Sequence, residues 1–332
     1  MNTSLVRALA MSVTAAVLFG SDGLWSAARN RAIIRQWWRY DKALEDTGSK
    51  MRGIQKTSEM VDESEGDTPG QPEGMRELGL AYANACGVKQ DYGKAVYWFR
   101  KAAQEGNAGA LENLAELYAR GKGIIENDEA ALRLLRRAAQ IGNGPAMTAI
   151  ALSIEANGGS LSDYKSAAAL FDCAARQGET TAMEQLAFLY MNGKGLDRNW
   201  DRSMELLRKA ASYGLPSAMG NLGIQYLYGP RKDRDYRKAV EWCESAARCG
   251  DPVGYFGCGC IYYDGFGRAK DERRAVALWE KAMECGLPRA MSSLGYAYQS
   301  GRGTPKLVDS AAFYFRVGAR LGDADSMCGL PK

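Results

Sequence analysis

The pattern in this sequence that comes nearest to catalytic chemistry is Ser162-Asp163-Tyr164-Lys165, which has the form Ser-x-x-Lys. In one class of serine hydrolases, a lysine at this spacing belongs to the machinery that activates the serine. The chain has neither the Ser-Asp-Asn nor the Lys-Thr-Gly sequence that accompanies the motif there, and Asp91-Tyr92 repeats its Asp-Tyr pair elsewhere. We therefore interpret the motif as structural, and a serine hydrolase using Ser162 and Lys165 is kept only as an alternative function.

The rest of the composition removes the commonest catalytic and metal-binding arrangements. The chain has no histidine, which excludes Ser-His-Asp and Cys-His catalytic sets and every imidazole metal ligand. The Asp and Glu residues are scattered, and no pair is recognisable as an acid–base couple. The sequence therefore predicts no enzyme activity, no catalytic residue, no metal site and no cofactor. A formal net charge of +4 without a basic stripe gives no reason to expect a nucleic-acid partner.

The cysteines are unevenly spread and do not form a recognisable framework. The eight are Cys86, Cys173, Cys243, Cys249, Cys258, Cys260, Cys285 and Cys328. Cys258 and Cys260 form Cys-x-Cys, which is not the Cys-x-x-Cys of redox and zinc sites. We interpret the cysteines as free thiols, many of them buried, and a bridge between Cys243 and Cys258 is the alternative, because both fall on core-facing repeat positions.

The elements that carry these residues repeat every 36 residues from Pro72, in frames that start at 72, 108, 144, 180, 216, 252 and 288. Apolar residues recur at positions four, seven and eleven of each frame, and position eight is always small. Position eleven, for example, reads Tyr82, Tyr118, Ile154, Tyr190, Tyr226, Tyr262 and Tyr298. These spacings place one apolar stripe on an α-helix, so each frame is predicted to open with a helix.

A second helix is predicted in the other half of each frame. Its apolar face opens on Ala95 in the first frame and continues at Trp98, and a glycine, Gly106, follows its end as a C-terminal cap requires. Gly-x-Gly turns separate the two helices, as at Gly121 and Gly123. These turns follow helices rather than strands, so they are not phosphate-binding loops.

One helix pair of this size cannot bury its own apolar face, whereas stacked pairs form a continuous core. We therefore predict an all-α protein, an α/α solenoid (superhelix) over residues 72–332 with seven repeats and a truncated eighth. The first helices should line its concave face.

The repeat resembles the Sel-1-like repeat, a branch of the tetratricopeptide superfamily. That family's pattern is matched closely by Ala182 through Gly214 and by Ala290 through Gly322. The chain departs from it at Asn157, at Pro230-Arg231 and at Leu307. The resemblance implies a non-catalytic scaffold or adaptor for another protein or peptide, of the kind found in envelope, pathogen–host and toxin-immunity binding proteins. A purely structural subunit of a larger assembly is the other alternative.

A partner is expected on the first helices, at positions five, six, nine and twelve, which lie off the core stripe. These positions are mostly polar or small in repeats one to three and turn apolar and aromatic from repeat four onward. The predicted partner-binding groove consists of Asn113, Gln185, Phe188, Met191, Asn221, Ile224, Leu227, Phe256, Tyr263 and Tyr296. The alternative is that packing within the solenoid buries the aromatic side chains and satisfies the amides.

The first 71 residues do not repeat. Residues 8–20 form an apolar run of signal-peptide length, which favours an exported or membrane-tethered protein, with mitochondrial or cytoplasmic localisation as alternatives. A helix with an Arg-rich, Trp-containing sequence is predicted at about 24–46, and it would cap the first repeat or associate with a membrane surface. Residues 1–56 are thus expected to be an N-terminal helical segment, and the acidic residues 57–71 a linker.

Overall fold

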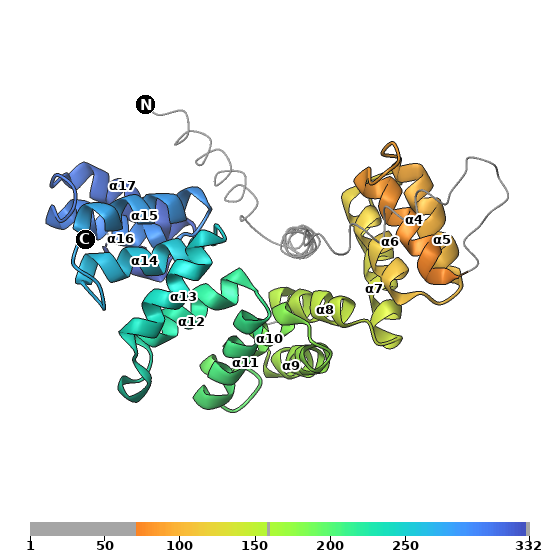
Figure 1. The fold of residues 1–332 in the computed structure, drawn as a ribbon, viewed down its shortest axis with the longest axis horizontal. Helices are drawn as coiled ribbons and strands as arrows, with labels where there is room; N and C mark the ends of the chain where they lie inside the picture. The colour runs from red at the N-terminus through yellow and green to blue at the C-terminus, as the bar shows by residue number, and fades with distance from the viewer. Residues whose placement is uncertain (1–70, 158–159, 330–332) are drawn as a thin grey trace. The chain divides into compact units, whose positions relative to one another are not determined.

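The computed structural model describes residues 71–157 and 160–329 of the 332-residue chain. Within these ranges it contains fifteen α-helices, a short 3-10 helix and no strand (Figure 1), which confirms the predicted α/α solenoid. The predictions for the N-terminal segment 1–56, for its apolar run 8–20 and for all but the last residue of the linker 57–71 lie outside the described residues.

First and second helices alternate along the whole described chain. The first helices are α4 (Pro72–Asn84), α6 (Ala108–Arg120), α8 (Gly144–Asn157), α10 (Thr180–Asn192), α12 (Pro216–Tyr228), α14 (Pro252–Asp264) and α16 (Arg289–Ser300). The second helices are α5 (Tyr92–Gln104), α7 (Asp128–Gln140), α9 (Leu161–Arg176), α11 (Trp200–Ser212), α13 (Tyr236–Arg248), α15 (Glu272–Glu284) and α17 (Val308–Arg320). The 3-10 helix η1 (Arg231–Asp233) interrupts repeat five, and α18 (Ala324–Gly329) opens the truncated eighth repeat.

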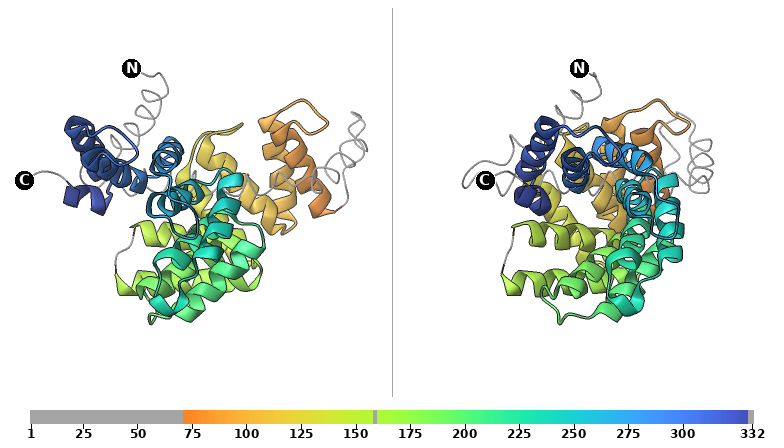
Figure 2. Two further views of the ribbon diagram at one scale, coloured as in Figure 1. Left: turned by 60° about the vertical axis from the view of Figure 1, so that its left-hand side comes forward. Right: turned by 90° about the vertical axis from the view of Figure 1, so that its left-hand side faces the viewer.

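The described residues form two compact units, an N-terminal unit of residues 71–200 and a C-terminal unit of residues 201–329. Within each unit the first and second helix of a repeat pack together, as α4 does with α5 and α14 with α15 (Figure 2). No helix among the described residues is long and apolar enough to cross a bilayer.

Capping interactions explain where the second helices begin. The side chains of Asp91, Asn127 and Asp271 accept hydrogen bonds from backbone N–H groups in the first turns of α5, α7 and α15. The backbone N–H of the capping residue also donates to the carbonyl of the position-eleven residue in the same repeat, for example from Asp91 to Tyr82 at 3.0 Å. The cap therefore fixes the angle between the two helices of a repeat.

Small residues at position eight are required by large residues on the second helix. A Cβ atom added at Gly79 would lie 2.5 Å from the ring of Phe99, and one added at Gly295 would lie 2.6 Å from the ring of Phe315. At Gly259 an added Cβ would overlap the indole of Trp279. The glycine thus admits the bulkier side chain into the core of its own repeat.

The Gly-x-Gly turns do more than separate helices. The second glycine of the turn lies against the start of the second helix in the preceding repeat. A Cβ atom added at Gly123 would lie 2.5 Å from the carbonyl oxygen of Tyr92, and one added at Gly303 would overlap that of Glu272. Both glycines also have positive φ angles, +66° and +76°. We call this packing the turn-to-helix contact.

The middle residue of the turn adds a side-chain interaction to the same contact. It meets a residue in the first turn of the preceding second helix through a cation–π contact, an aromatic stack or an ion pair. The four pairs are Lys122 with Tyr92, Lys194 with Tyr164, Phe266 with Tyr236 and Arg302 with Glu272. Consecutive repeats are therefore joined at their turns as well as through their cores.

Candidate partner-binding site

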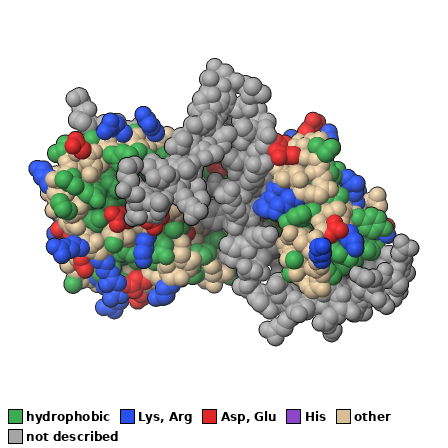
Figure 3. All heavy atoms as spheres, turned by 90° about the horizontal axis from the view of Figure 1, so that it is seen from above, with side chains coloured by type: hydrophobic (Ala, Val, Ile, Leu, Met, Phe, Trp, Pro, Cys, Tyr) green, Lys and Arg blue, Asp and Glu red, His purple; other side chains and the backbone are tan. Residues whose placement is uncertain are grey.

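Charge alone does not single out a binding surface. On the face drawn in Figure 3, basic and acidic side chains are interspersed with hydrophobic ones. The exposure and contacts of the predicted groove residues define the candidate site, and they differ between the two units.

In the N-terminal unit, all four predicted groove residues, Asn113, Gln185, Phe188 and Met191, are partly exposed on first helices. Asn113 is unusual, because its side-chain carbonyl oxygen is shielded from solvent and accepts no hydrogen bond from the described residues. These four positions are compatible with contact to another chain, and their role in binding stays a prediction.

In the C-terminal unit, the expected exposure is wrong for three residues. Ile224, Leu227 and Phe256 are only 6%, 1% and 4% exposed. The cause is the close approach of α12 and α14, which glycines on both helices permit. A Cβ atom at Gly257 would lie 3.3 Å from Cδ1 of Ile224, so Ile224 fills the space beside that glycine. These three residues belong to the core.

Tyrosines remain accessible on the same helices. Tyr296 is 43% exposed and Tyr228 is 44% exposed, whereas Tyr263 and Asn221 are half-buried. Tyr228, Tyr263 and Tyr296 lie on the consecutive first helices α12, α14 and α16, at positions that face away from the core stripe. We call this surface the tyrosine face.

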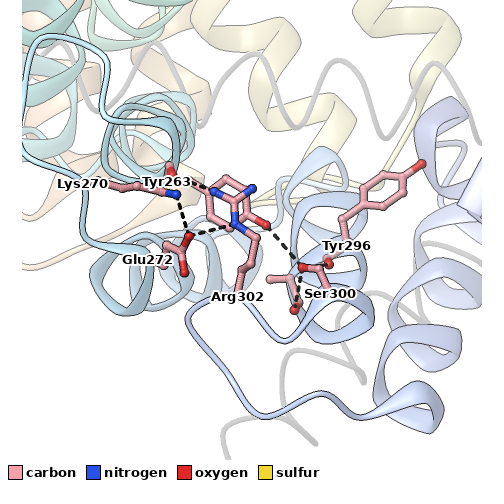
Figure 4. Close-up of polar contacts among 7 residues, drawn as sticks. Tyr263, Lys270, Glu272, Tyr296, Ser300 and Arg302 are labelled. Atoms are coloured by element: carbon pink, nitrogen blue, oxygen red, sulfur yellow. Dashed lines mark hydrogen bonds and ion pairs between the residues drawn. The ribbon is translucent and has the colours of Figure 1, made fainter.

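Tyr263 is held in place from several directions (Figure 4). The Arg302 guanidinium lies 3.9 Å from the centre of its ring, and Arg302 also donates to the Tyr263 carbonyl oxygen at 3.2 Å. The Trp279 ring lies 4.9 Å from the Tyr263 ring, measured between centroids. The Tyr263 ring is therefore fixed before any partner arrives.

Arg302 is itself fixed by a carboxylate. Its Nε donates to Glu272 Oε1 at 2.8 Å, and Lys270 Nζ lies 2.9 Å from the same oxygen. Hydrogen bonds from Lys270 and Arg302 lower the pKa of Glu272, and the hydrogen bond to Glu272 raises the pKa of Arg302. The turn-to-helix contact between repeats six and seven thus also orders the tyrosine face.

Tyr296 is held by a contact with the core, and its side chain points away from Arg302 (Figure 4). Its ring meets the buried ring of Phe315 edge-on, with centroids 4.9 Å apart. The Ser300 hydroxyl donates to the Tyr296 carbonyl oxygen at 2.7 Å and lies 3.5 Å from the hydroxyl of Tyr263. Ser300 therefore links the two tyrosines.

The chemistry of the tyrosine face suits binding. Burial raises the pKa of Tyr228 well above its usual value, so its hydroxyl stays protonated near neutral pH. Tyrosine offers an apolar ring and a hydrogen-bonding tip at low cost in conformational entropy. The face can thus cover apolar groups of a partner and hydrogen-bond to its polar ones.

The Ser-x-x-Lys motif has a structural explanation. Ser162 and Lys165 are both exposed in the first turns of α9. Next to them, Ser160 and Asp163 form a reciprocal capping box that begins the helix. Helix capping accounts for the Asp at the second position of the motif.

The eight cysteines are free thiols, and the alternative bridge between Cys243 and Cys258 is not formed. Cys243, Cys258 and Cys260 are buried, whereas Cys173, Cys249, Cys285 and Cys328 are exposed and Cys86 is intermediate. Burial raises the pKa of all three buried thiols. Their structure is that of core residues.

The sequence analysis missed Tyr228 and Arg302. Tyr228 occupies position thirteen, one residue beyond the positions considered, at the C-terminal end of α12. Arg302 is the middle residue of a turn whose glycines drew attention first. The signal for Arg302 was its pairing with Glu272, 30 residues earlier, which recurs in other repeats as Lys122 with Tyr92 and Lys194 with Tyr164.

Comparison with known proteins agrees with the repeat frames. The Sel1 repeat model matches residues 72–107, 108–143, 145–179, 180–214, 216–251, 252–287 and 288–323. This chain belongs to the Sel1 repeat family. Proteins of the family generally bind other proteins and are typically non-catalytic scaffolds. No curated protein sequence matches the chain.

Two solved structures are similar to this Sel1 repeat chain. One is a Sel1 repeat protein from Oxalobacter formigenes, at 26% identity and a TM-score of 0.61, with 73% of this chain and 99% of that chain covered. The other is a protective antigen of uropathogenic Escherichia coli, at 25% identity and a TM-score of 0.56. That match covers 83% of this chain but spans only 57% of the antigen's length.

Proposed function

We propose that this chain is a non-catalytic scaffold that binds a partner protein or peptide on the tyrosine face. The observation that carries the proposal is the fixed position of Tyr263, between the Arg302 guanidinium and the Trp279 ring, beside the exposed Tyr296. A side chain that is ordered before binding loses little entropy on association. Tyrosine is also among the residues that contribute most to binding energy at interfaces.

The arrangement favours a partner segment that combines apolar side chains with hydrogen-bond acceptors. The rings of Tyr228 and Tyr296 offer exposed apolar area, and the Tyr296 hydroxyl can donate to a backbone carbonyl group. Similarity to a protective antigen of a pathogenic bacterium supports a setting at the bacterial envelope or in host contact. Toxin immunity is the other setting that the family resemblance offers.

The test uses peptides selected from a random library for binding to the full chain. Combining Tyr263→Ala with Tyr296→Ala is expected to weaken their binding at least about tenfold, because two ordered aromatic anchors are lost. The control combines Tyr97→Ala with Tyr213→Ala, which removes tyrosines that are 51% and 57% exposed, one on the second helix α5 and the other directly after the end of α11. Circular dichroism must show equal helix content in all variants.

Two outcomes would contradict the proposal. Selected peptides would bind the double variant of the tyrosine face as tightly as the parent. Alternatively, the control variant would lose binding to the same extent, which would place the site on the second helices. Charging Ile224 or Phe256 is unsuitable as a test, because both are buried and the change would disturb the core.

A further inference from the structure

A pocket of about 640 Å³ lies in the C-terminal unit where repeat four meets repeat five. Its charged and aromatic lining residues are Arg208, Tyr226, Lys238, Glu241 and Trp242. Apart from Tyr226, which belongs to α12, they lie on the second helices α11 and α13 (Figure 1). A volume of this size suits a small molecule or a few side chains of a peptide. We call it the inter-repeat pocket, and no residue of the tyrosine face lines it.

Arg208 is the cation of this pocket that is best prepared to bind an anion. Its Nε donates to the Tyr226 hydroxyl at 3.3 Å, and it forms no ion pair with a carboxylate of the described residues. Because Tyr226 is only 6% exposed, the hydrogen bond holds the guanidinium against a fixed group. The two terminal nitrogens remain as donors, and a guanidinium binds a carboxylate or a phosphate through two parallel hydrogen bonds.

Tyr226 and Lys238 add donors beside this guanidinium. The Tyr226 oxygen accepts the hydrogen bond from Arg208, so its own O–H hydrogen can be donated to a ligand. Lys238 Nζ lies 5.5 Å from the centre of the Tyr226 ring and 3.3 Å from Asp235 Oδ2. An ammonium group has three donors, and one ion pair leaves others for a ligand.

The charges around the pocket favour a ligand with a single negative charge. Asp235 offsets part of the charge of Lys238, and the exposed carboxylate of Glu241 is part of the lining. A phosphate ester, with a charge of about −1.5 to −2, would be repelled by Glu241 more strongly than a carboxylate. The Ser212 and Ser245 hydroxyls, which also line the pocket, donate to backbone carbonyl groups of their own helices at 2.8 and 2.7 Å. The pocket therefore fits a carboxylate better than a phosphate.

Trp242 decides which group fits beside the carboxylate. It follows Lys238 at i, i+4 spacing on α13, so the two side chains are neighbours on one side of that helix. The half-buried indole gives the pocket a flat apolar wall. A flat apolar group packs well against such a ring, which makes an aromatic acid a better fit than an aliphatic one.

Repeat one shows that the pocket is not a general property of this repeat. Arg100 occupies the position there that Arg208 occupies in repeat four, and its Nη2 donates to the Tyr118 hydroxyl at 3.1 Å. The next second helix, however, has Ala130 and Leu134 at the positions of the second cation and of the indole. The arginine–tyrosine pair is thus shared between repeats, and only repeat five completes it with a lysine and a tryptophan.

We propose that the inter-repeat pocket binds a carboxylate that is attached to a flat apolar group. Arg208 and Lys238 hold the carboxylate, the Tyr226 hydroxyl donates to it, and the apolar group packs against Trp242. The carboxylate belongs either to a free aromatic acid or to an acidic side chain that lies beside an aromatic one in a peptide. The site does not depend on the tyrosine face, so each can be tested without the other.

Nuclear magnetic resonance of the full chain tests this proposal. The probe is phenylacetate, and phenylacetamide has the same ring without the charge. The readout is the indole N–H signal of Trp242, one of seven tryptophans in the chain, and Trp242→Phe identifies it. We expect phenylacetate to shift this signal saturably and phenylacetamide to bind about tenfold more weakly, because it cannot accept charged hydrogen bonds as a carboxylate does.

Three variants separate recognition of charge from damage to the fold. Arg208→Gln is expected to weaken phenylacetate binding about tenfold, because a charged donor is lost. Glu241→Gln should strengthen it about twofold, and a disturbed fold would not produce such a gain. The matched control is Arg100→Gln, which removes the equivalent arginine of repeat one and should leave binding unchanged.

The proposal fails if phenylacetate leaves the Trp242 signal unchanged, if phenylacetamide binds equally well, or if Arg208→Gln has no more effect than Arg100→Gln. Tighter binding of phenyl phosphate than of phenylacetate would overturn the choice of a carboxylate. A short amidated peptide with glutamate beside phenylalanine separates the two sources. Tighter binding of this peptide than of phenylacetate supports a site for partner side chains, and weaker binding supports a site for a free acid.

Discussion

Cys243, Cys258 and Cys260 are three thiols that lie close together in the core of the C-terminal unit, each at most 5% exposed. Burial raises the pKa of Cys258 to about 12 and that of Cys260 to about 11, so their thiolate forms are rare near neutral pH. We predict that a thiol reagent modifies Cys173, Cys249 and Cys328 rapidly in the native protein, and Cys285 more slowly because burial raises its pKa. The three buried thiols should react only after denaturant is added, which mass spectrometry of the labelled peptides can follow. Rapid native labelling of Cys260 would contradict this assignment.

Glu272 gives the tyrosine face a defined pH dependence. Its pKa in the folded protein is lowered by Lys270 and Arg302, so its contribution to stability is present above the unfolded pKa, near 4.5. That contribution is lost as pH falls through the lower, folded pKa. We predict that Glu272→Gln lowers the melting temperature near neutral pH and that the difference from the parent shrinks on acidification. A difference that grows as pH falls would show that the ion pair is not the cause.

Because of the turn-to-helix contact between repeats, two glycines with similar backbone angles should differ in how much stability is lost when each is replaced by alanine. Gly303 and Gly286 have φ angles of +76° and +86°. A Cβ atom added at Gly303 would overlap Glu272 of the preceding repeat, whereas a Cβ atom added at Gly286 would have no neighbouring atom within 4 Å. Gly286→Ala is expected to cost about 1–2 kcal/mol from backbone strain alone. Gly303→Ala should cost about 1–3 kcal/mol more from overlap. Denaturant unfolding of both variants measures the difference in their free energies of unfolding. Equal losses of stability would mean that the turn-to-helix contact adds nothing to the cost of backbone strain.

At the scale of helices, the sequence predicted the period, the positions of both helices and the core stripe, because these depend on spacing within one repeat. It could not predict that Ile224 and Phe256 are buried. Their burial depends on how closely α12 and α14 approach, and that distance is set by glycines on neighbouring repeats. The same holds for Arg302, whose partner Glu272 lies outside its own frame. Contacts that cross a repeat boundary therefore cannot be predicted from the sequence of a single repeat.

For the whole molecule, a solenoid in which repeats contact mainly their neighbours should respond locally to damage. Gly259→Ala would place a methyl group against Trp279, which is 3% exposed, and should cost about 1–3 kcal/mol. We predict that hydrogen exchange then accelerates in α12 to α16 and stays unchanged in α4 to α8. Uniform acceleration over both units would show a single cooperative structure instead.

The turn-to-helix contact also decides where this chain could be cut and rejoined. A cassette cut at the frame boundaries, such as residues 216–251, takes Tyr236 but leaves Phe266 and Gly267, which pack against it, in the recipient. A cassette of the same length that starts at the second helix, residues 236–271, carries both halves together. Grafts between proteins of this family should therefore be spliced at the start of a second helix, so that each turn travels with the helix on which it rests.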